Sequence, residues 1–486
     1  MSGFDSGDES KAYIDGYIAR ARKAQEAFGA SAQDRLDAAA RAAGKAVFDN
    51  AEALARLAVD ETGMGVCEDK AFKNRNKARM IWNSLKGRRS CGAIARDEAS
   101  GITEIAKPVG VVAAITPCTN PIATPMSNCM FALKGGNAII ITPHHRSAGS
   151  SAATVELIDA ALRKLGLPEN LVQIVGVHSR ENTRNLMAAA DMVVATGGAG
   201  MVKAAYSSGR PALGVGVGNV QCIVDDSADL ADAAAKTVAG RCFDNGILCS
   251  AEQSAIISDG AFDGFVAALE ANGAFVVRGG ADRAALRAAL FPDGEMSRHA
   301  VGQSAAEVAR LAGISLPGGA RAIAVVAEGP GGADPLSREK MCPVLALFRA
   351  RDFRDAVEIA RENLENEGKG HSVSIHSRSE ENIWYAAERL SVSRFLVNQC
   401  SATNAGGSFS NGLAPTSTLG CGTWGNNSIS ENLNYRHFIN VSRIALDMQG
   451  RAVPTDDEIW GPDSPAARPL PPVDRETGKD GADSGH

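Results

Sequence analysis

The 486-residue sequence lacks the features that mark membrane, nucleic-acid-binding and disulfide-rich proteins. No run reaches the roughly 18 apolar residues that a membrane span requires, and the polar, acidic N-terminus lacks the apolar core of a signal peptide. There is no basic stretch with interleaved aromatic residues, and the net charge of −6 argues against nucleic-acid binding. The ten cysteines include no Cys-x-x-Cys pair, which argues against disulfides or a zinc site. We therefore expect a cytoplasmic protein with reduced thiols and no metal, membrane or nucleic-acid partner.

Glutamate is also missing from one long interval, Thr196 to Ser250, which ends beside a cysteine in a distinctive context. That cysteine, Cys249, lies in the run FDNGILCSAEQS at 243–254. A cysteine that holds an acyl group as a thioester loses it to water only if a base activates the water, and a carboxylate is the usual base. If no base is available, the thioester persists until a better nucleophile, such as another thiol, attacks it.

Strand and helix patterns alternate from Val109 onward. Continuous apolar runs at 110–115, 138–141 and 192–195 are typical of parallel strands buried on both faces. Upstream, residues 10–90 have the scattered apolar positions of several amphipathic helices. The sequence therefore predicts an α/β protein with parallel sheets, and its length predicts two or three domains.

Three further segments differ from this alternation. The polar stretch 91–107 predicts a hairpin around Ser100-Gly101. Residues 400–432 are rich in Gly, Ser, Thr and Asn with almost no charge, which indicates a long loop folded over a site. The stretch 451–486 holds six of the nineteen prolines and many Asp and Gly residues, and we expect a mobile tail there.

Three phrases together resemble the CoA-acylating aldehyde dehydrogenases: FDNGILCSAEQS, TGGAGMVKAAYSSGR at 196–210 and LGCGTWGNNS at 419–428. They are most similar to the aldehyde dehydrogenase half of bifunctional aldehyde–alcohol dehydrogenases, and the resemblance covers about residues 13–445. Hydrolytic members of the superfamily carry a water-activating glutamate upstream of the cysteine. Here the corresponding stretch, GVGVGN at 214–219, has no acid.

The resemblance implies an aldehyde dehydrogenase-like fold: two α/β domains with parallel sheets and a small oligomerisation arm. The implied limits are a cofactor-binding domain at 1–96 and 107–224, an arm at 97–106 and 432–450, a catalytic domain at 225–431, and the tail at 451–486. Because the arm crosses to a neighbouring subunit in this family, a homodimer or homotetramer is expected.

The resemblance also assigns the catalytic residues. Cys249 is the nucleophile, and its thiol must ionise, which positive potential or helix dipoles commonly favour. Asn120 donates its amide to the oxyanion, with the backbone N–H of Cys249 as second donor, although Asn before proline is also a common turn former. His371 matches a histidine of the acylating group, where it acts as base or hydrogen-bond donor for CoA, or is a satisfied structural histidine.

Cofactor contacts follow from the same resemblance. The strand, glycine turn and helix at 192–207 can present free N–H groups to a pyrophosphate, whereas the glycines at 214–218 open no helix and form no dinucleotide fingerprint. Hydrolytic relatives have a lysine and often a glutamate where this chain has Thr142 and His145, so the choice of NAD or NADP stays open. His144 and Arg146 suit a 2′-phosphate or a solvated loop. The expected cofactor contacts are Thr116, Pro117, Thr142, His144, Gly197, Gly198, Gly216 and Glu339, with Glu339 on the nicotinamide ribose.

The expected activity is reversible, NAD(P)-dependent oxidation of a small aldehyde to an acyl-CoA through a Cys249 thioester, with coenzyme A as co-substrate. A hydrolytic enzyme that gives a free acid and a non-catalytic binding protein are the alternatives. Polar residues at 401–410 favour a small polar aldehyde. The candidates are sulfoacetaldehyde, acetaldehyde and succinate semialdehyde, with Arg436 or His437 as possible contacts to an anionic tail.

Overall fold

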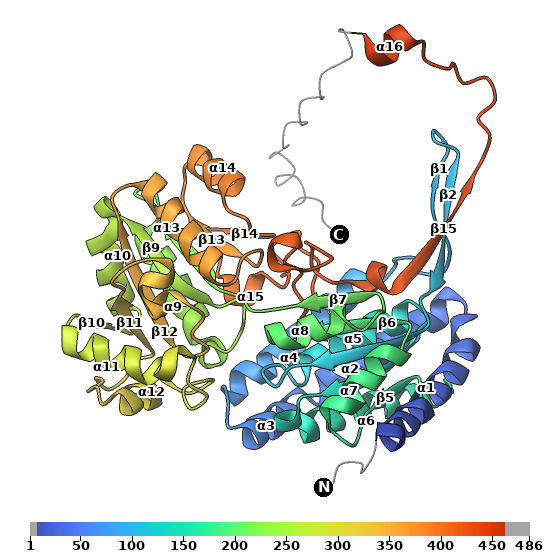
Figure 1. Ribbon diagram of the computed structural model, residues 1–486, viewed down its shortest axis with the longest axis horizontal. Helices are drawn as coiled ribbons and strands as arrows, with labels where there is room; N and C mark the ends of the chain where they lie inside the picture. The colour runs from blue at the N-terminus through green and yellow to red at the C-terminus, as the bar shows by residue number, and fades with distance from the viewer. Residues whose placement is uncertain (1–6, 462–486) are drawn as a thin grey trace, which may run out of the picture.

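Three separate β-sheets organise the chain in the computed structural model, which describes residues 7–461. Two of the sheets form the centres of α/β lobes that lie side by side, and the third forms an arm that projects from the body (Figure 1). We call the bodies the five-stranded lobe and the seven-stranded lobe. None of the described helices is both long and apolar enough to cross a membrane.

The five-stranded lobe is parallel throughout, in the order β5-β4-β3-β6-β7. Its strands are β3 (Val111–Thr116), β4 (Ala138–Pro143), β5 (Val172–Ile174), β6 (Met192–Thr196) and β7 (Ala212–Val215). Every residue of β3 and β4 is buried, which explains the continuous apolar runs in the sequence. Strand order reverses between β3 and β6, and ligands of such sheets bind outside the carboxyl ends at this switch point.

Helices surround this sheet (Figure 1). They are α1 (Gly7–Gly29), α2 (Gln33–Asp49), α3 (Ala51–Thr62), α4 (Cys67–Leu85), α5 (Ala123–Lys134), α6 (Ala148–Lys164), α7 (Arg180–Ala189) and α8 (Ala199–Tyr206). Helix α2 shows why they pack: Leu36, Ala39, Ala40, Ala43 and Val47 recur every three or four residues and are all buried. Small alanine side chains let α2 lie close against α4, α5 and α6.

The seven-stranded lobe is also parallel, in the order β10-β11-β12-β9-β8-β13-β14. Its strands are β8 (Val220–Val224), β9 (Glu252–Ser258), β10 (Ala274–Val277), β11 (Ala322–Val326), β12 (Val344–Ala350), β13 (Val373–His376) and β14 (Phe395–Val397). Its helices are α9 (Leu230–Cys242), α10 (Asp259–Ala271), α11 (Gly280–Leu290), α12 (Ala305–Ala312), α13 (Phe353–Asn366), α14 (Glu380–Arg389) and α15 (Ser401–Asn404). Alternate residues of the strands enter two hydrophobic clusters, one on each face of the sheet.

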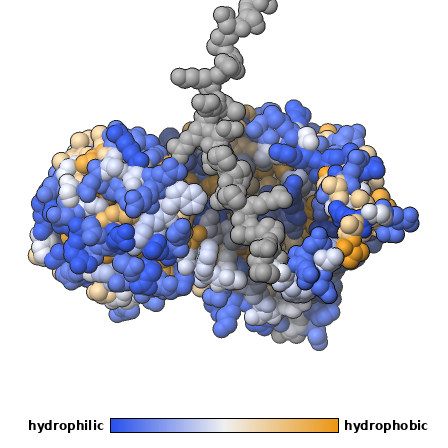
Figure 2. Space-filling view, turned by 90° about the horizontal axis from the view of Figure 1, so that it is seen from above, coloured by the Kyte–Doolittle hydropathy of each residue, from blue (hydrophilic) through white to orange (hydrophobic). Residues whose placement is uncertain are grey.

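The arm is an antiparallel sheet in the order β1-β2-β15, made of β1 (Gly92–Asp97), β2 (Ile102–Pro108) and β15 (Ile439–Ala445). Most of its residues are exposed or only partly buried, so the arm has little core of its own. On the body, Figure 2 shows a largely hydrophilic face on which hydrophobic residues form small separate groups.

The predicted α/β class, the three predicted strands and the hairpin at 91–107 are confirmed. The arm was expected at 97–106 and 432–450, whereas its strands and the hairpin turn cover 92–108 and 439–445. The other domain limits stay predictions. Of the predicted tail, residues 451–461 include the short helix α16 (Asp456–Trp460), and residues 462–486 lie outside the described part of the chain.

Candidate active site

The site lies where the carboxyl edge of the five-stranded sheet meets the amino edge of the seven-stranded sheet. Asn120 follows β3, whereas Cys249 precedes β9, and both line one cavity of about 270 Å³. Helix α4 supplies Lys73 and Lys77 to its wall. The loop 402–419 closes the cavity, so the prediction that residues 400–432 fold over a site is confirmed.

Cys249 follows a short 3-10 turn, η2 (Phe243–Gly246), and is partly accessible from the cavity. Its carbonyl packs against Gly218, where an added Cβ would lie 2.1 Å from the oxygen, so only glycine fits. Burial, with smaller contributions from Glu339 and Cys421, raises the pKa of the Cys249 thiol to about 12. Of the nearby charges, the Arg394 cation opposes this rise.

Asn120 lies in the turn between β3 and α5, and its carbonyl accepts the N–H of Thr124 at the start of the helix. Its side-chain Oδ1 accepts a hydrogen bond from Lys73 Nζ at 2.6 Å. In the described part of the chain, Nδ2 donates to no protein group. An amide with a fixed oxygen and a free N–H at the nucleophile's cavity suits an oxyanion donor. Asn120 is thus brought to Cys249 while also forming the turn.

His371 precedes β13 and is fully buried, with neither ring nitrogen hydrogen-bonded among residues 7–461. The ring lies beside Gly218, the glycine that also contacts Cys249. Burial and the Arg394 cation lower the pKa of His371 to about 3, so the ring is neutral at physiological pH. His371 is therefore not a structural histidine whose hydrogen bonds are all made. Its neutral ring has one free donor and one free acceptor.

Glu339 precedes β12, on the same amino edge of the seven-stranded sheet. The N–H of Gly218 interacts with its carboxyl group, which lies close enough to Cys249 to raise the pKa of that thiol when it is ionised. Burial, together with the nearby Glu367 carboxylate, raises the pKa of Glu339 to about 8. Although part of Glu339 is accessible, its carboxyl group is thus largely protonated near pH 7.

The expected cofactor residues gather at the switch point of the five-stranded sheet. Thr116 and Thr142, at the ends of the adjacent strands β3 and β4, have buried hydroxyls without a partner in the described residues. Gly198 caps α8, and a Cβ added there or at Gly216 would meet nothing within 4 Å. Unpaired hydroxyls, open space and the first N–H groups of α8 fit a dinucleotide pyrophosphate.

The remaining cofactor residues lie at the same edge. Pro117 directly follows Thr116, Gly197 precedes the cap of α8, and His144 follows β4. His144 accepts the N–H of Arg146 at 3.2 Å, while Arg146 Nη2 donates to the Thr62 carbonyl at 3.1 Å. Burial, His145 and Arg146 lower the pKa of His144, which favours its neutral form.

Several residues considered from the sequence lie away from the cavity lining. Cys242, the second candidate nucleophile, donates to the Arg321 carbonyl, and burial raises its pKa to about 11. Arg436 and His437 lie in the turn before β15, where His437 contacts Glu431 at 3.1 Å, so neither can meet the tail of a substrate in this cavity.

Sequence reasoning missed the lysines of α4 and the carboxylate that pairs with two of them. Lys70, Lys73 and Lys77 recur on one face of α4, and this three-and-four spacing was the available signal. Asp244 is a carboxylate inside the interval that lacks glutamate, and it is fully buried in ion pairs with Lys70 and Lys73. No aspartate or glutamate lines the cavity in the described residues.

Comparisons with known proteins agree with this geometry. The sequence matches the aldehyde dehydrogenase family over residues 5–437. It is 50% identical over 444 residues to the succinate-semialdehyde dehydrogenase (acetylating) of Clostridium kluyveri, covering 91% of this chain and 98% of that protein. It is 42% identical over 449 residues to the sulfoacetaldehyde dehydrogenase (acylating) of Cupriavidus necator, covering 91% of each. The crystal structure of an acetylating aldehyde dehydrogenase from Geobacillus thermoglucosidasius has a TM-score of 0.89 at 33% identity, covering 93% of this chain and 100% of that one.

The chain therefore belongs to the aldehyde dehydrogenase family and, within it, to the CoA-acylating enzymes. The resemblance noted in the sequence, the fold class and the acylating activity are confirmed, and the acylating interpretation is favoured over the hydrolytic one. Enzymes of this kind use CoA and a nicotinamide cofactor.

Proposed function

We propose that this enzyme interconverts a short aldehyde with an anionic tail and its acyl-CoA, with succinate semialdehyde as the preferred aldehyde. The observation that carries the proposal is Lys77, a cation in the wall of the Cys249 cavity without a carboxylate partner among residues 7–461. Its Nζ donates to the Gly406 carbonyl at 2.7 Å, which leaves other N–H donors for a ligand.

Electrostatics favour an anion at this place. Burial and, to a smaller extent, the neighbouring Lys73 cation lower the pKa of Lys77 to about 8. A desolvated cation without a counter-ion is costly, and a substrate carboxylate or sulfonate beside it removes that cost. Lys77 remains mostly protonated at pH 7, so it can pair with an anionic tail.

The volume of the cavity and its apolar walls further narrow the choice among the candidate aldehydes. A cavity of about 270 Å³ is at the small end for ligand pockets, and Phe72, Phe243 and Leu248 give it apolar walls. Two methylene groups suit such walls, which favours succinate semialdehyde over sulfoacetaldehyde, and acetaldehyde has no anion for Lys77. The succinate-semialdehyde and sulfoacetaldehyde dehydrogenases named above support an anionic aldehyde.

The overall reaction is aldehyde + CoA-SH + NAD(P)⁺ ⇌ acyl-CoA + NAD(P)H + H⁺. The Cys249 thiol loses its proton and its sulfur adds to the carbonyl carbon, while Asn120 Nδ2 donates to the oxygen that becomes negatively charged. A bound nicotinamide cofactor would supply the acceptor for the hydride that leaves the aldehyde carbon. The acyl group then remains on Cys249 until the CoA thiol displaces it, and we propose that the neutral His371 ring hydrogen-bonds the CoA sulfur or the thioester.

The cofactor and the assembly are part of the same proposal. The cofactor is NAD or NADP, held by Thr116, Thr142, the glycine turn before α8 and Glu339, and rates with each cofactor decide between them. The arm, with its small core, joins subunits into a homodimer or homotetramer, which the molar mass in solution tests. Location in the cytoplasm stays a prediction from the sequence.

Replacement of Lys77 by Met tests the substrate assignment. We expect the kcat/KM for succinate semialdehyde to fall roughly 10- to 100-fold, as expected for loss of a charged hydrogen bond, whereas butanal, its uncharged analogue, loses less than about threefold. A Lys45→Met variant, which changes an exposed lysine of α2, is the matched control. Equal losses for both aldehydes would refute the anionic-tail assignment.

A further inference from the structure

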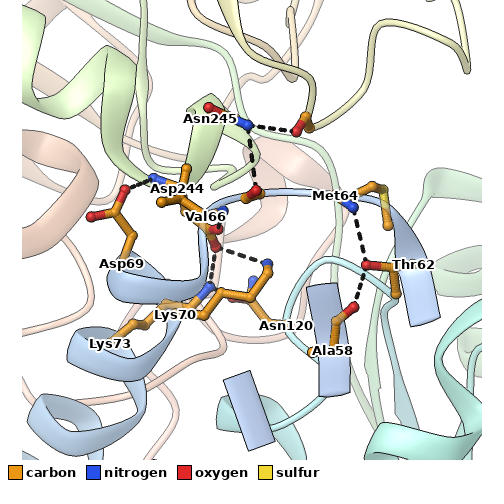
Figure 3. Close-up of polar contacts among 12 residues, drawn as sticks. Ala58, Thr62, Met64, Val66, Asp69, Lys70, Lys73, Asn120, Asp244 and Asn245 are labelled. Carbon is orange, nitrogen blue, oxygen red and sulfur yellow. Dashed lines mark hydrogen bonds and ion pairs between the residues drawn. The ribbon is translucent and has the colours of Figure 1, made fainter. Parts of the chain in front are cut away.

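The segment that leads to the nucleophile contains two consecutive residues in the left-handed region, Asp244 at φ 52° and Asn245 at φ 54°. Side chains rarely adopt this backbone unless the surroundings hold it. Here Asp69 accepts the N–H of Asp244 at 2.8 Å, and Asn245 Nδ2 donates to the Gly302 carbonyl at 2.9 Å (Figure 3). These contacts turn the carboxylate of Asp244 toward α4 of the other lobe.

The Asp244 carboxylate is completely buried against the start of α4. Oδ1 accepts the N–H of Val66 at 2.9 Å, and Oδ2 accepts Lys70 Nζ at 3.0 Å and Lys73 Nζ at 2.7 Å. Burial by itself raises the pKa of Asp244, but Lys73, Lys70 and the hydrogen bonds outweigh burial and hold the pKa below its ordinary value. Asp244 is therefore an anion with fixed partners.

Lys73 differs from Lys70 in one respect. Both bind Asp244, but Lys73 Nζ also lies 2.6 Å from Asn120 Oδ1 (Figure 3). Because an ammonium group can only donate hydrogen bonds, the oxygen of the Asn120 amide must face Lys73. The Nδ2 group of the same planar amide then points away from Lys73.

We propose that Lys73, anchored by Asp244, is a positioning residue that fixes the Asn120 amide with Nδ2 toward the carbonyl oxygen of the aldehyde at Cys249. The proposal rests on Asn120 as oxyanion donor. Without Lys73, the Asn120 amide can rotate and turn its oxygen toward the oxyanion. The two oxygens then repel each other, and the oxyanion loses its donor. Asp244 lies five residues before Cys249, so one carboxylate links the nucleophile segment to the residue that orients the donor.

A comparison of Lys73→Met with Lys70→Met tests this role. Each variant removes one cation from Asp244, but only Lys73→Met releases Asn120. We expect Lys73→Met to lower kcat roughly 10- to 100-fold more than Lys70→Met, since loss of an oxyanion donor costs about 100-fold or more. The effect should be the same with succinate semialdehyde and with butanal, because it concerns the carbonyl and not the tail. KM should change much less than kcat.

A double-mutant cycle separates positioning from general support of the fold. Asn120→Ala alone should lower kcat strongly, and adding Lys73→Met to it should cost less than about threefold more, because Lys73 acts through Asn120. Lys73→Gln keeps a neutral donor and should recover part of the kcat lost in Lys73→Met. If Lys73→Met does not fold, the comparison of Lys73→Gln alone and in the Asn120→Ala background takes its place.

Three outcomes overturn the proposal. Equal kcat losses in Lys70→Met and Lys73→Met would make Lys73 a structural ion-pair partner only. A kcat loss with succinate semialdehyde but not with butanal would make Lys73 a tail-binding residue. Fully additive kcat losses in the double mutant would show that Lys73 does not act through the Asn120 amide. The double mutant combines Asn120→Ala with Lys73→Met, or with Lys73→Gln where that variant is used. A full kcat in Asn120→Ala would refute the oxyanion assignment itself, a failure distinct from these three.

Discussion

The contact between Gly218 and the nucleophile makes a prediction that the geometry can quantify. Gly218 lies between β7 and β8, where the chain passes from one lobe to the other. A Cβ at this position would be 2.1 Å from the Cys249 carbonyl oxygen and 3.0 Å from its carbonyl carbon. Unstrained contacts of this kind are about 3.5 Å, so Gly218→Ala must move the two backbones apart by about 1.4 Å.

The nucleophile's backbone has little freedom to move away from that contact. Cys249 is joined to β9, whose first residues are fully buried within the sheet. A displacement of about 1 Å at a catalytic group can cost on the order of 100-fold in rate. We therefore expect kcat of Gly218→Ala to fall roughly 100-fold, with an overpacking cost of about 1–3 kcal/mol in the free energy of unfolding.

The assay is the rate of NAD(P)H formation at 340 nm with aldehyde and CoA, together with thermal unfolding and the rate of Cys249 alkylation. Gly318→Ala is the matched control, since a Cβ there meets nothing within 4 Å, and it should leave all three unchanged. A Gly218→Ala enzyme with more than about a third of the wild-type kcat would refute the argument that this contact fixes the nucleophile. A variant that does not fold at all would show that the contact supports the fold and not merely the site.

Two other predictions concern the acyl intermediate. Cys249→Ser should lower acyl-CoA formation by several orders of magnitude while the thermal transition stays within a few degrees of wild type, because the covalent thioester cannot form; retention of about a tenth of the activity would place the nucleophile elsewhere. With aldehyde and oxidised cofactor but no CoA, one equivalent of NAD(P)H per active site should form rapidly at pH 7 and then nearly stop. Mass spectrometry should find the acyl group on the Cys249 peptide, and steady production of free acid would contradict the acylating mechanism.

The sequence predicts those parts of the fold whose side chains are buried on every face. Strands β3 and β4 are completely buried, so their apolar runs are unbroken and mark a parallel sheet. The amphipathic helices are visible for the same reason, because one face is apolar. The exposed arm has no such pattern beyond its hairpin, and the resemblance alone suggested it.

The sequence predicted those site residues that lie within one distinctive segment. It missed those whose role depends on contacts between segments far apart in the chain. Cys249 stands in a distinctive run of twelve residues, whereas the ion pair of Lys73 with Asp244 joins residues 171 positions apart. A lysine in a helix is ordinarily solvated, so nothing in the composition of α4 distinguishes the buried Lys73 from an exposed one. The raised pKa of Cys249 was missed for a similar reason, because burial by residues distant in sequence causes it.

The lifetime of the proposed thioester depends on whether the nearby carboxyl groups can act as bases toward water, and not only on the missing glutamate. Asp244 is close to the nucleophile segment, but its ion pairs with Lys70 and Lys73 keep its pKa low, which makes it a weak base. Glu252 is buried beside α9, where one oxygen accepts the Ser401 N–H, and it does not line the cavity. Glu339 lies close enough to influence the pKa of Cys249, but burial raises its own pKa to about 8, so most of it is protonated at pH 7 and only a small fraction is available as a base. Each acid is thus disfavoured as a base for a different physical reason, which supports the proposal that the acyl group on Cys249 waits for the CoA thiol.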